Sequence, residues 1–264
     1  MNPARATDNT EADPVRDPGI VVRGDLHLHT TWSDGRDTVE RMARACLSRG
    51  YAYLAITDHS RSLRVARGLS PERLRMQWAE IDRVRARVPE IRILRGLEVD
   101  ILPSGGLDLP DDMLEALDLV IISVHSRLDM PRARFTDRVI RAMSHPATDI
   151  LGHPTGRMIG RRKPSDLDLD AVLRAAAELD VAVEINAQPH RLDLDADNAR
   201  RAREIGVRLA IDTDAHAVGA LDYMAAGLRL AADAGLASTD VLNASTLPAL
   251  EAWLARDRSL PDTT

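Results

Sequence analysis

The stretch from residue 25 to residue 35, DLHLHTTWSDG, decides which fold the chain can adopt. A short apolar run ends here in His27 and His29, where a doubly wound open sheet would usually carry a glycine-rich phosphate loop. Residues two apart on a strand point to the same side, so this pair can hold one metal ion from one face. Asp34 follows in the loop and adds a carboxylate. The stretch therefore favours a barrel enzyme with a metal site over a nucleotide-binding open sheet.

Outward from this stretch, short apolar runs alternate with helical patterns almost to the end of the chain, as in a parallel sheet of βα units. The expected strands lie near 20–28, 53–58, 91–98, 118–124, 149–152, 181–186 and 207–213. One helix should end at Gly50 and the next should begin at Ser70, and others are expected near 111–117, 136–144, 168–179, 195–205 and 220–234. At 264 residues the chain fits one α/β barrel. We expect one domain at 20–258, between a disordered N-terminal tail at 1–19 and a C-terminal tail at 259–264.

The amino-acid composition argues against several classes of function. The net charge of −6 argues against a broad cationic surface for duplex nucleic acid, and 3% aromatic residues are too few for a base-stacking platform. The single cysteine, Cys46, allows no internal disulfide and no cysteine-based zinc site. No apolar stretch is long enough to span a membrane, and the first twenty residues lack the apolar core of a secretion signal. The sequence therefore predicts a cytoplasmic protein without a membrane partner.

Imidazole and carboxylate side chains fall at the C-terminal ends of the expected strands, where barrel enzymes assemble their sites. Nine candidate metal ligands result: His27, His29, Asp34, His59, Glu98, His125, His153, Asp214 and His216. Such donors without thiolate suit Zn²⁺, Mn²⁺ or Fe²⁺. Nine ligands exceed the needs of one ion, so we expect a cluster of two or three ions.

The charge of such a cluster indicates the kind of substrate. Three divalent ions and the carboxylates of Asp34, Glu98 and Asp214 would leave a net charge of about +3 in a small pocket. Clustered ions can activate water, bind the non-bridging oxygens of a phosphate and stabilise the leaving oxygen. We therefore expect a phosphate-ester substrate.

A family resemblance rests on seven segments, which read DLHLHTTWSDG, AITDHS, GLEVDIL, SVHS, GHPTGR, EINAQPHRLDL and DTDAH. Together they resemble the polymerase and histidinol phosphatase (PHP) domain family, and most of all the C-terminal PHP region of bacterial family X DNA polymerases. The resemblance implies an α/β fold, a distorted (βα)₇ TIM-like barrel, with three divalent metal ions and a metal-bound hydroxide that attacks phosphorus. The implied ligand sets are His27, His29, Glu98 and Asp214 for one ion, Glu98, His125 and His153 for the second, and Asp34, His59 and His216 for the third.

The resemblance leaves two substrates open. One is a DNA 3′ end, cut by a 3′–5′ exonuclease or 3′-phosphatase that works with a DNA repair or replication partner. The other is a small molecule, as for a phosphatase of the histidinol-phosphatase type. Arg157 and Arg161 follow the strand that ends in His153, and we expect them to bind the substrate phosphate.

Two other functions compete with hydrolysis of a phosphate ester. An amidohydrolase also uses an H-x-H pair and a late aspartate, but many bridge their metals with a carbamylated lysine, and here Lys163 is the sole lysine and lies in an Arg-rich loop. A non-catalytic metal-stabilised module would show degenerate ligands, and all nine positions are filled.

Several polar residues near the candidate ligands are expected to support them. Glu184 and Asn186 point to one side of a strand and would orient a ligand or a water. Asp25 and Asp58 are expected to fix histidine tautomers. Trp32 would pack either against a base or sugar of the substrate or against the core.

Overall fold

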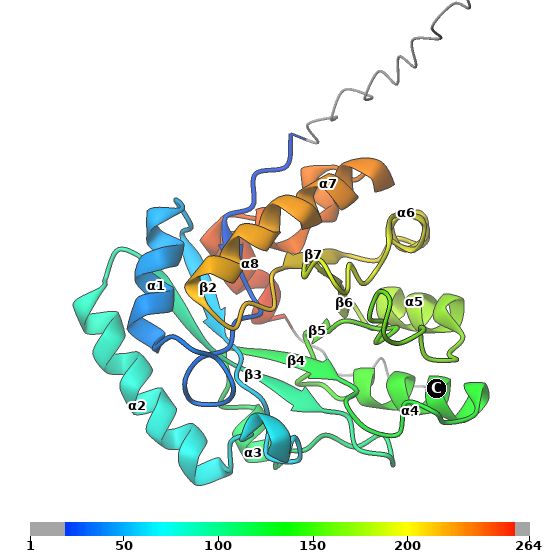
Figure 1. Ribbon diagram of the computed structural model, residues 1–264, viewed down its shortest axis with the longest axis horizontal. Helices are drawn as coiled ribbons and strands as arrows, with labels where there is room; N and C mark the ends of the chain where they lie inside the picture. Colours follow the sequence, from blue (N-terminus) through cyan, green and yellow to red (C-terminus); the bar gives the residue numbers. More distant parts are fainter. Residues whose placement is uncertain (1–18, 257–264) are drawn as a thin grey trace, which may run out of the picture.

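A computed structural model describes residues 19–256, so of the two expected tails only Gly19 lies within the described range. Within that range seven parallel strands form one sheet in chain order, from β1 to β7 (Figure 1). The strands are β1 (Gly24–Asp25), β2 (Tyr53–Ile56), β3 (Arg92–Asp100), β4 (Leu119–Ser123), β5 (Ile150–Leu151), β6 (Ala182–Asn186) and β7 (Leu209–Asp212). Each pairs in parallel with the next, and helices surround them. The expected (βα)₇ barrel is thereby confirmed.

The α-helices of residues 19–256 are α1 (Val39–Ser48), α2 (Pro71–Arg87), α3 (Asp111–Leu114), α4 (Arg132–Met143), α5 (Leu169–Glu178), α6 (Ala196–Ile205), α7 (Met224–Ala234) and α8 (Leu247–Leu254). Four 3₁₀ segments join them: η1 (Arg64–Ala66), η2 (Val218–Tyr223), η3 (Ser238–Asp240) and η4 (Leu242–Ala244). As predicted, Ser70 caps α2, with Oγ accepting from the backbone N–H of Arg73 at 3.4 Å. Each helix of the described chain is too short or too polar to cross a lipid bilayer.

The inward-facing positions of the strands change in character from one end of the barrel to the other. Near the N-terminal ends they are apolar, as at Leu94 and Ala210, and these side chains pack with Leu250 and Trp253 of α8, which covers that end. Because side chains alternate along a strand, later inward positions carry acids: Glu98 lies four residues beyond Leu94 on β3, after Gly96, and Asp212 lies two residues beyond Ala210 on β7. The polar layer is thus placed at the C-terminal ends of the strands, above a sealed apolar floor.

One side chain makes much of the closure of the barrel between β1 and β7. Asn243 of η4 is fully buried, and its Oδ1 accepts from the backbone N–H of Ile211 at 3.1 Å. Its Nδ2 donates to the carbonyl oxygens of Ile211, at 2.6 Å, and of Gly24, at 2.9 Å. The amide therefore takes the place of a strand backbone between the first strand and the last. Farther along this seam, the junction of the first and last strands, the backbone N–H of His29 donates to the carbonyl of Ala215 at 2.9 Å. The segments that follow β1 and β7 therefore lie side by side.

Candidate metal centre

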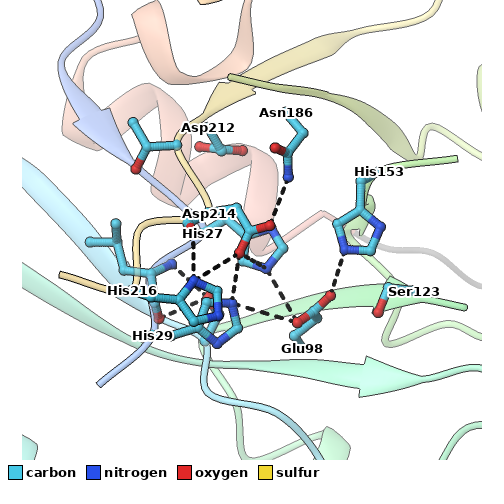
Figure 2. A network of polar contacts seen from close by, with 12 residues as sticks. His27, His29, Glu98, Ser123, His153, Asn186, Asp212, Asp214 and His216 are labelled. Atoms are coloured by element: carbon cyan, nitrogen blue, oxygen red, sulfur yellow. Dashed lines mark hydrogen bonds and ion pairs between the residues drawn. The ribbon is translucent and has the colours of Figure 1, made fainter. Parts of the chain in front are cut away.

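The structure brings all nine predicted ligands together at the C-terminal ends of the strands. Glu98 on β3 lies at the centre, with His27 and His29 on one side and His153 on the other (Figure 2). Its Oε2 is 2.7 Å from Nδ1 of His59 and 3.4 Å from Nε2 of His27. Its Oε1 is 2.9 Å from Nε2 of His153 and 3.4 Å from Nε2 of His125. The remaining members surround the imidazole of His29 and are Asp34, Asp214 and His216.

Three groups of side chains each bring their ligand atoms within 4.8 Å of one another. They are His29, Asp34, His59 and His216; His27, His29 and Asp214; and His59, Glu98 and His125. The first two correspond to two of the sets implied by the family resemblance, with His29 added to the first and Glu98 missing from the second. The third combines Glu98 with His125 as implied, but with His59 where the resemblance has His153.

Many of these atoms are buried without a hydrogen-bond partner among the described residues. They include both ring nitrogens of His29, Nε2 of His27, Nδ1 of His59 and both carboxylate oxygens of Glu98. A buried polar atom without a partner costs about 1–3 kcal/mol, so a protein that gathers this many needs something else to bind them. Divalent ions are bound by imidazole nitrogens and carboxylate oxygens that face a common point and keep their lone pairs free of hydrogen bonds. The donor set therefore fits a cluster of Zn²⁺, Mn²⁺ or Fe²⁺.

Charge states within the cluster also suit metal binding. Burial lowers the pKa of His29 to about 3 and that of His153 to about 4, so both imidazoles are neutral at pH 7 and keep a free lone pair. Burial alone would raise the pKa of Glu98, but the imidazoles of His59, His125 and His27 hold it well below its ordinary value. The pKa of Asp214 is likewise held low by neighbouring imidazoles against the effect of burial. Against the effect of burial, the neighbouring carboxylates raise the pKa of His27, His59 and His216. The cluster thus offers two neutral imidazoles, those of His29 and His153, beside ionised carboxylates, and a bound ion would take the place of the protons on the other rings.

Side chains outside the nine hold several of them in place. Oε1 of Glu184 lies 2.6 Å from Nδ1 of His27, which leaves Nε2 facing the cluster. Oδ1 of Asp100 lies 2.8 Å from Nδ1 of His125 in the same way. Nδ2 of Asn186 donates to Oδ2 of Asp214 at 3.0 Å. Glu184 and Asn186 take the orienting positions expected for them, whereas Asp100 was missed, although it follows Glu98 by two residues and so faces the same side of β3.

The two aspartates expected to fix histidine tautomers hold backbone instead. Asp58 accepts from the backbone N–H of Thr30, at 2.8 Å, and of Ser33, at 3.1 Å. Asp25 accepts from the backbone N–H of Thr213, at 3.2 Å, and from its hydroxyl, at 2.5 Å. In both cases the loops beside the cluster present backbone and hydroxyl donors that need an acceptor, and the buried carboxylate supplies it.

A second set of contacts holds the loop that carries Asp34. The guanidinium of Arg67 donates to the carbonyl of Ser33, and that of Arg73 donates to the carbonyl of Trp32. The indole of Trp32 donates to Oε2 of Glu80 at 2.9 Å and packs against the core. Of the two roles expected for Trp32, the structure shows packing against the core. The loop is therefore held by Arg67, which directly follows η1, and by α2.

A pocket of about 650 Å³ opens over the cluster. Its lining includes the cationic side chains of Arg36 and Arg191, and Nε of Arg191 lies 3.7 Å from Oδ2 of Asp214. Sequence reasoning assigned no role to either arginine. Arg36 follows Asp34 by two residues, and Arg191 lies five residues beyond Asn186, in the loop after β6.

Neither Arg157 nor Arg161, the predicted substrate-binding residues, is among the residues that line this pocket. The guanidinium of Arg157 is used within the fold: it donates to the carbonyls of Arg191 and Leu192, at 2.8 and 2.5 Å, and pairs with Asp195 at 2.9 Å. Arg161 is exposed in the loop after Arg157 and lines a separate hollow. In the structure the pocket wall takes its arginines from the loops after β1 and β6, whereas these two residues of the loop after β5 lie outside it.

The sequence was compared with models of known protein families. The model of the PHP domain matches residues 25–188, which is more than half of the chain and includes seven of the nine clustered residues. The chain belongs to the PHP domain family.

Relatives of this PHP chain include enzymes of two kinds. It is 45% identical over 236 residues to a protein named DNA polymerase/3′-5′ exonuclease PolX from Bacillus subtilis, covering 89% of this chain and 41% of that one. The chain thus spans about two fifths of that relative. It is 29% identical to a protein named probable phosphatase from Thermoanaerobacter sp. strain X514, covering 83% of this chain and 89% of that one. These relatives confirm the predicted class, a metal-dependent phosphoesterase of the PHP type.

Solved structures show the same barrel. Histidinol phosphate phosphatase from Lactococcus lactis, crystallised with zinc, L-histidinol and phosphate, superposes with a TM-score of 0.57 at 17% identity, covering 78% of this chain and 92% of that one. A putative histidinol phosphatase from Listeria monocytogenes gives a TM-score of 0.61 at 14% identity, covering 75% and 97%. At these identities the likeness concerns the fold alone.

Proposed function

We propose that this PHP chain hydrolyses phosphate esters at the 3′ end of DNA with three divalent ions bound by the nine clustered residues. The observation that carries the proposal is the convergence of buried donor atoms without hydrogen-bond partners on Glu98 and His29. Bound ions would supply positive charge to the phosphate oxygens and lower the pKa of a coordinated water.

The chain's own residues prepare the site for an anion. Glu184 and Asp100 hold the rings of His27 and His125 so that one nitrogen of each faces the cluster. Arg36 and Arg191 add cationic groups around the mouth of the pocket. In the hydrolysis, water adds to phosphorus and the bond from phosphorus to the ester oxygen breaks, and the departing oxygen takes a proton that water has released.

The nucleic-acid substrate is supported by the 45% identity to the exonuclease-named PolX protein, which extends over 89% of this chain. Arg36 and Arg191 give a local cationic mouth in a protein of net charge −6, which suits the end of a strand better than the length of a duplex. The match to phosphatases of nearly this chain's length favours a second candidate, the small phosphate monoester.

A paired assay tests the proposal. Hydrolysis of a 3′-recessed oligonucleotide and of simple phosphate monoesters is measured with Mn²⁺, with Zn²⁺ and after chelation. We expect release of nucleotides from the oligonucleotide, lost on chelation and lost in His27→Ala. Cys46→Ala, a substitution in α1 away from the pocket, is the matched control and should retain activity. Hydrolysis that survives both chelation and His27→Ala would refute the metal-dependent mechanism, and hydrolysis of monoesters alone would favour the second candidate.

A further inference from the structure

We propose that the apolar side of the pocket mouth, formed by η1 and η2, binds the nucleobase of the terminal nucleotide, with Val65 and Tyr223 as its contacts. This inference rests on the proposed function, because it assigns a place to the organic part of the phosphate ester that the cluster would hydrolyse. It gives the pocket two subsites, one for phosphate and one for a planar, apolar group.

The two 3₁₀ segments supply a continuous set of apolar residues to the pocket wall. The residues that line it are Leu63, Val65 and Ala66 from the loop after β2, and Ala217, Ala220 and Tyr223 from the loop after β7. Val65 is 90% exposed, the highest value among the exposed large hydrophobic residues. Burial of an exposed apolar side chain against a ligand is favourable by about 25 cal/mol per Å². Val65 thus offers a ligand contact that the fold itself does not use.

The size of the pocket fits more than a phosphate. Its volume of about 650 Å³ lies in the range of sites that enclose a drug-sized ligand. Phosphate would lie over the cluster, beside Arg36 and Arg191, which leaves the apolar wall for the remainder of the substrate. One aromatic ring, that of Tyr223, suffices to contact a single terminal base, even though the chain has too few aromatic residues to bind a long strand by stacking.

Charge further limits what the organic part can be. Among the described residues that line the pocket, the carboxylates are Asp34 and Asp214, and both belong to the candidate metal cluster. No acidic side chain of that described lining is therefore left to pair with an amino group, and Arg36 and Arg191 would repel one. An ester of a cationic amino alcohol is disfavoured, whereas a nucleotide, which is anionic at phosphate and apolar on the base face, matches both walls.

The test compares two single-stranded oligonucleotides that are identical except at the 3′ terminus, where one carries thymidine and the other an abasic tetrahydrofuran residue. The Mn²⁺-loaded full chain should cleave the thymidine strand with a kcat/KM about tenfold higher, a factor typical of one base contact. The double variant Val65→Ser/Tyr223→Ala should bring that ratio below about threefold, mainly through KM. Because both substrates share the metal cluster, any damage to the cluster cancels in the ratio.

Met76→Ser is the matched control, since Met76 is 60% exposed on α2 and does not line the pocket. Its ratio should stay near tenfold. A ratio near one in the wild type, with hydrolysis intact, would overturn the base-binding role and leave the proposed function standing. A tenfold ratio that persists in the double variant would also overturn it. Absence of hydrolysis of both strands would refute the proposed function, and this inference with it.

Discussion

Replacing Asn243 with alanine tests whether one side chain closes the barrel. The N–H and C=O of Ile211 point to the same side of β7 and both bond to the Asn243 amide, and the carbonyl of Gly24 bonds to it from β1. Alanine would leave these three buried backbone groups without that partner, at about 1–3 kcal/mol each. We expect a loss of about 3–6 kcal/mol in the free energy of unfolding, allowing for partial relaxation, out of the 5–15 kcal/mol typical of a domain.

The assay is urea unfolding followed by circular dichroism, in chelator so that metal binding does not add to stability. Asn198→Ala is the control, because the Asn198 side chain in α6 makes no hydrogen bond among the described residues, and it should change stability by less than about 0.5 kcal/mol. Asn243→Ala should also weaken metal binding, since β1 and β7 carry His27 and Asp214 to the cluster. A loss below about 1 kcal/mol with unchanged metal affinity would refute the role of Asn243 as a strand substitute.

Three further predictions concern the surroundings of the cluster. Glu184→Gln should weaken metal affinity about 10- to 100-fold in a metal titration, because Glu184 holds the ring of His27; unchanged affinity would contradict that role. Asp193 is buried in the loop after β6, where it accepts from the hydroxyl of Thr155 at 2.9 Å. Burial raises the pKa of Asp193 from 3.8 to about 6, so in chelator its stabilising contribution should be complete below pH 4 and lost as the pH rises through 6. The loss should amount to about 3 kcal/mol and be absent in Asp193→Asn; melting curves at pH 4 and 7.5 that shift equally in both proteins would argue against it. Arg191→Ala should raise KM for a phosphate ester about tenfold, whereas Arg157→Ala should mainly lower the melting temperature, and the reverse pattern would restore Arg157 as the substrate contact.

The order and type of the secondary-structure elements could be predicted from the sequence because each strand and helix has a local pattern. The strand at 53–58 and the helix beginning at Ser70 are found as β2 and α2 with small shifts at their ends. The first strand is reduced from the expected 20–28 to Gly24–Asp25, because its neighbour across the seam is a side chain of η4 and not a full strand. No local sequence pattern predicts that a side chain will pair with a strand edge, so the role of Asn243 was not predicted.

The nine clustered residues could be located from their place at strand ends, since parallel strands deliver those ends to one face. The residues of the pocket wall could not be located in this way, because they lie in loops whose paths have no pattern in the sequence. Arg157 turned out to hold the loop that carries Arg191, a contact between residues 34 apart that spacing in the sequence does not encode. The apolar residues of η1 and η2 are similarly brought to one pocket from loops more than 150 residues apart, Val65 to Tyr223.

The spread of the nine residues along the chain has a consequence for biosynthesis. His27 emerges from the ribosome early, but Asp214 and His216 lie near the end of the described sequence, and the seam that holds them in place needs Asn243. A nascent chain that stops short of that asparagine would have most of its imidazoles yet no closed ring of strands to present them. Capture of the full complement of ions is therefore expected only after translation has passed Asn243, and it would distinguish such chains from shorter translation intermediates.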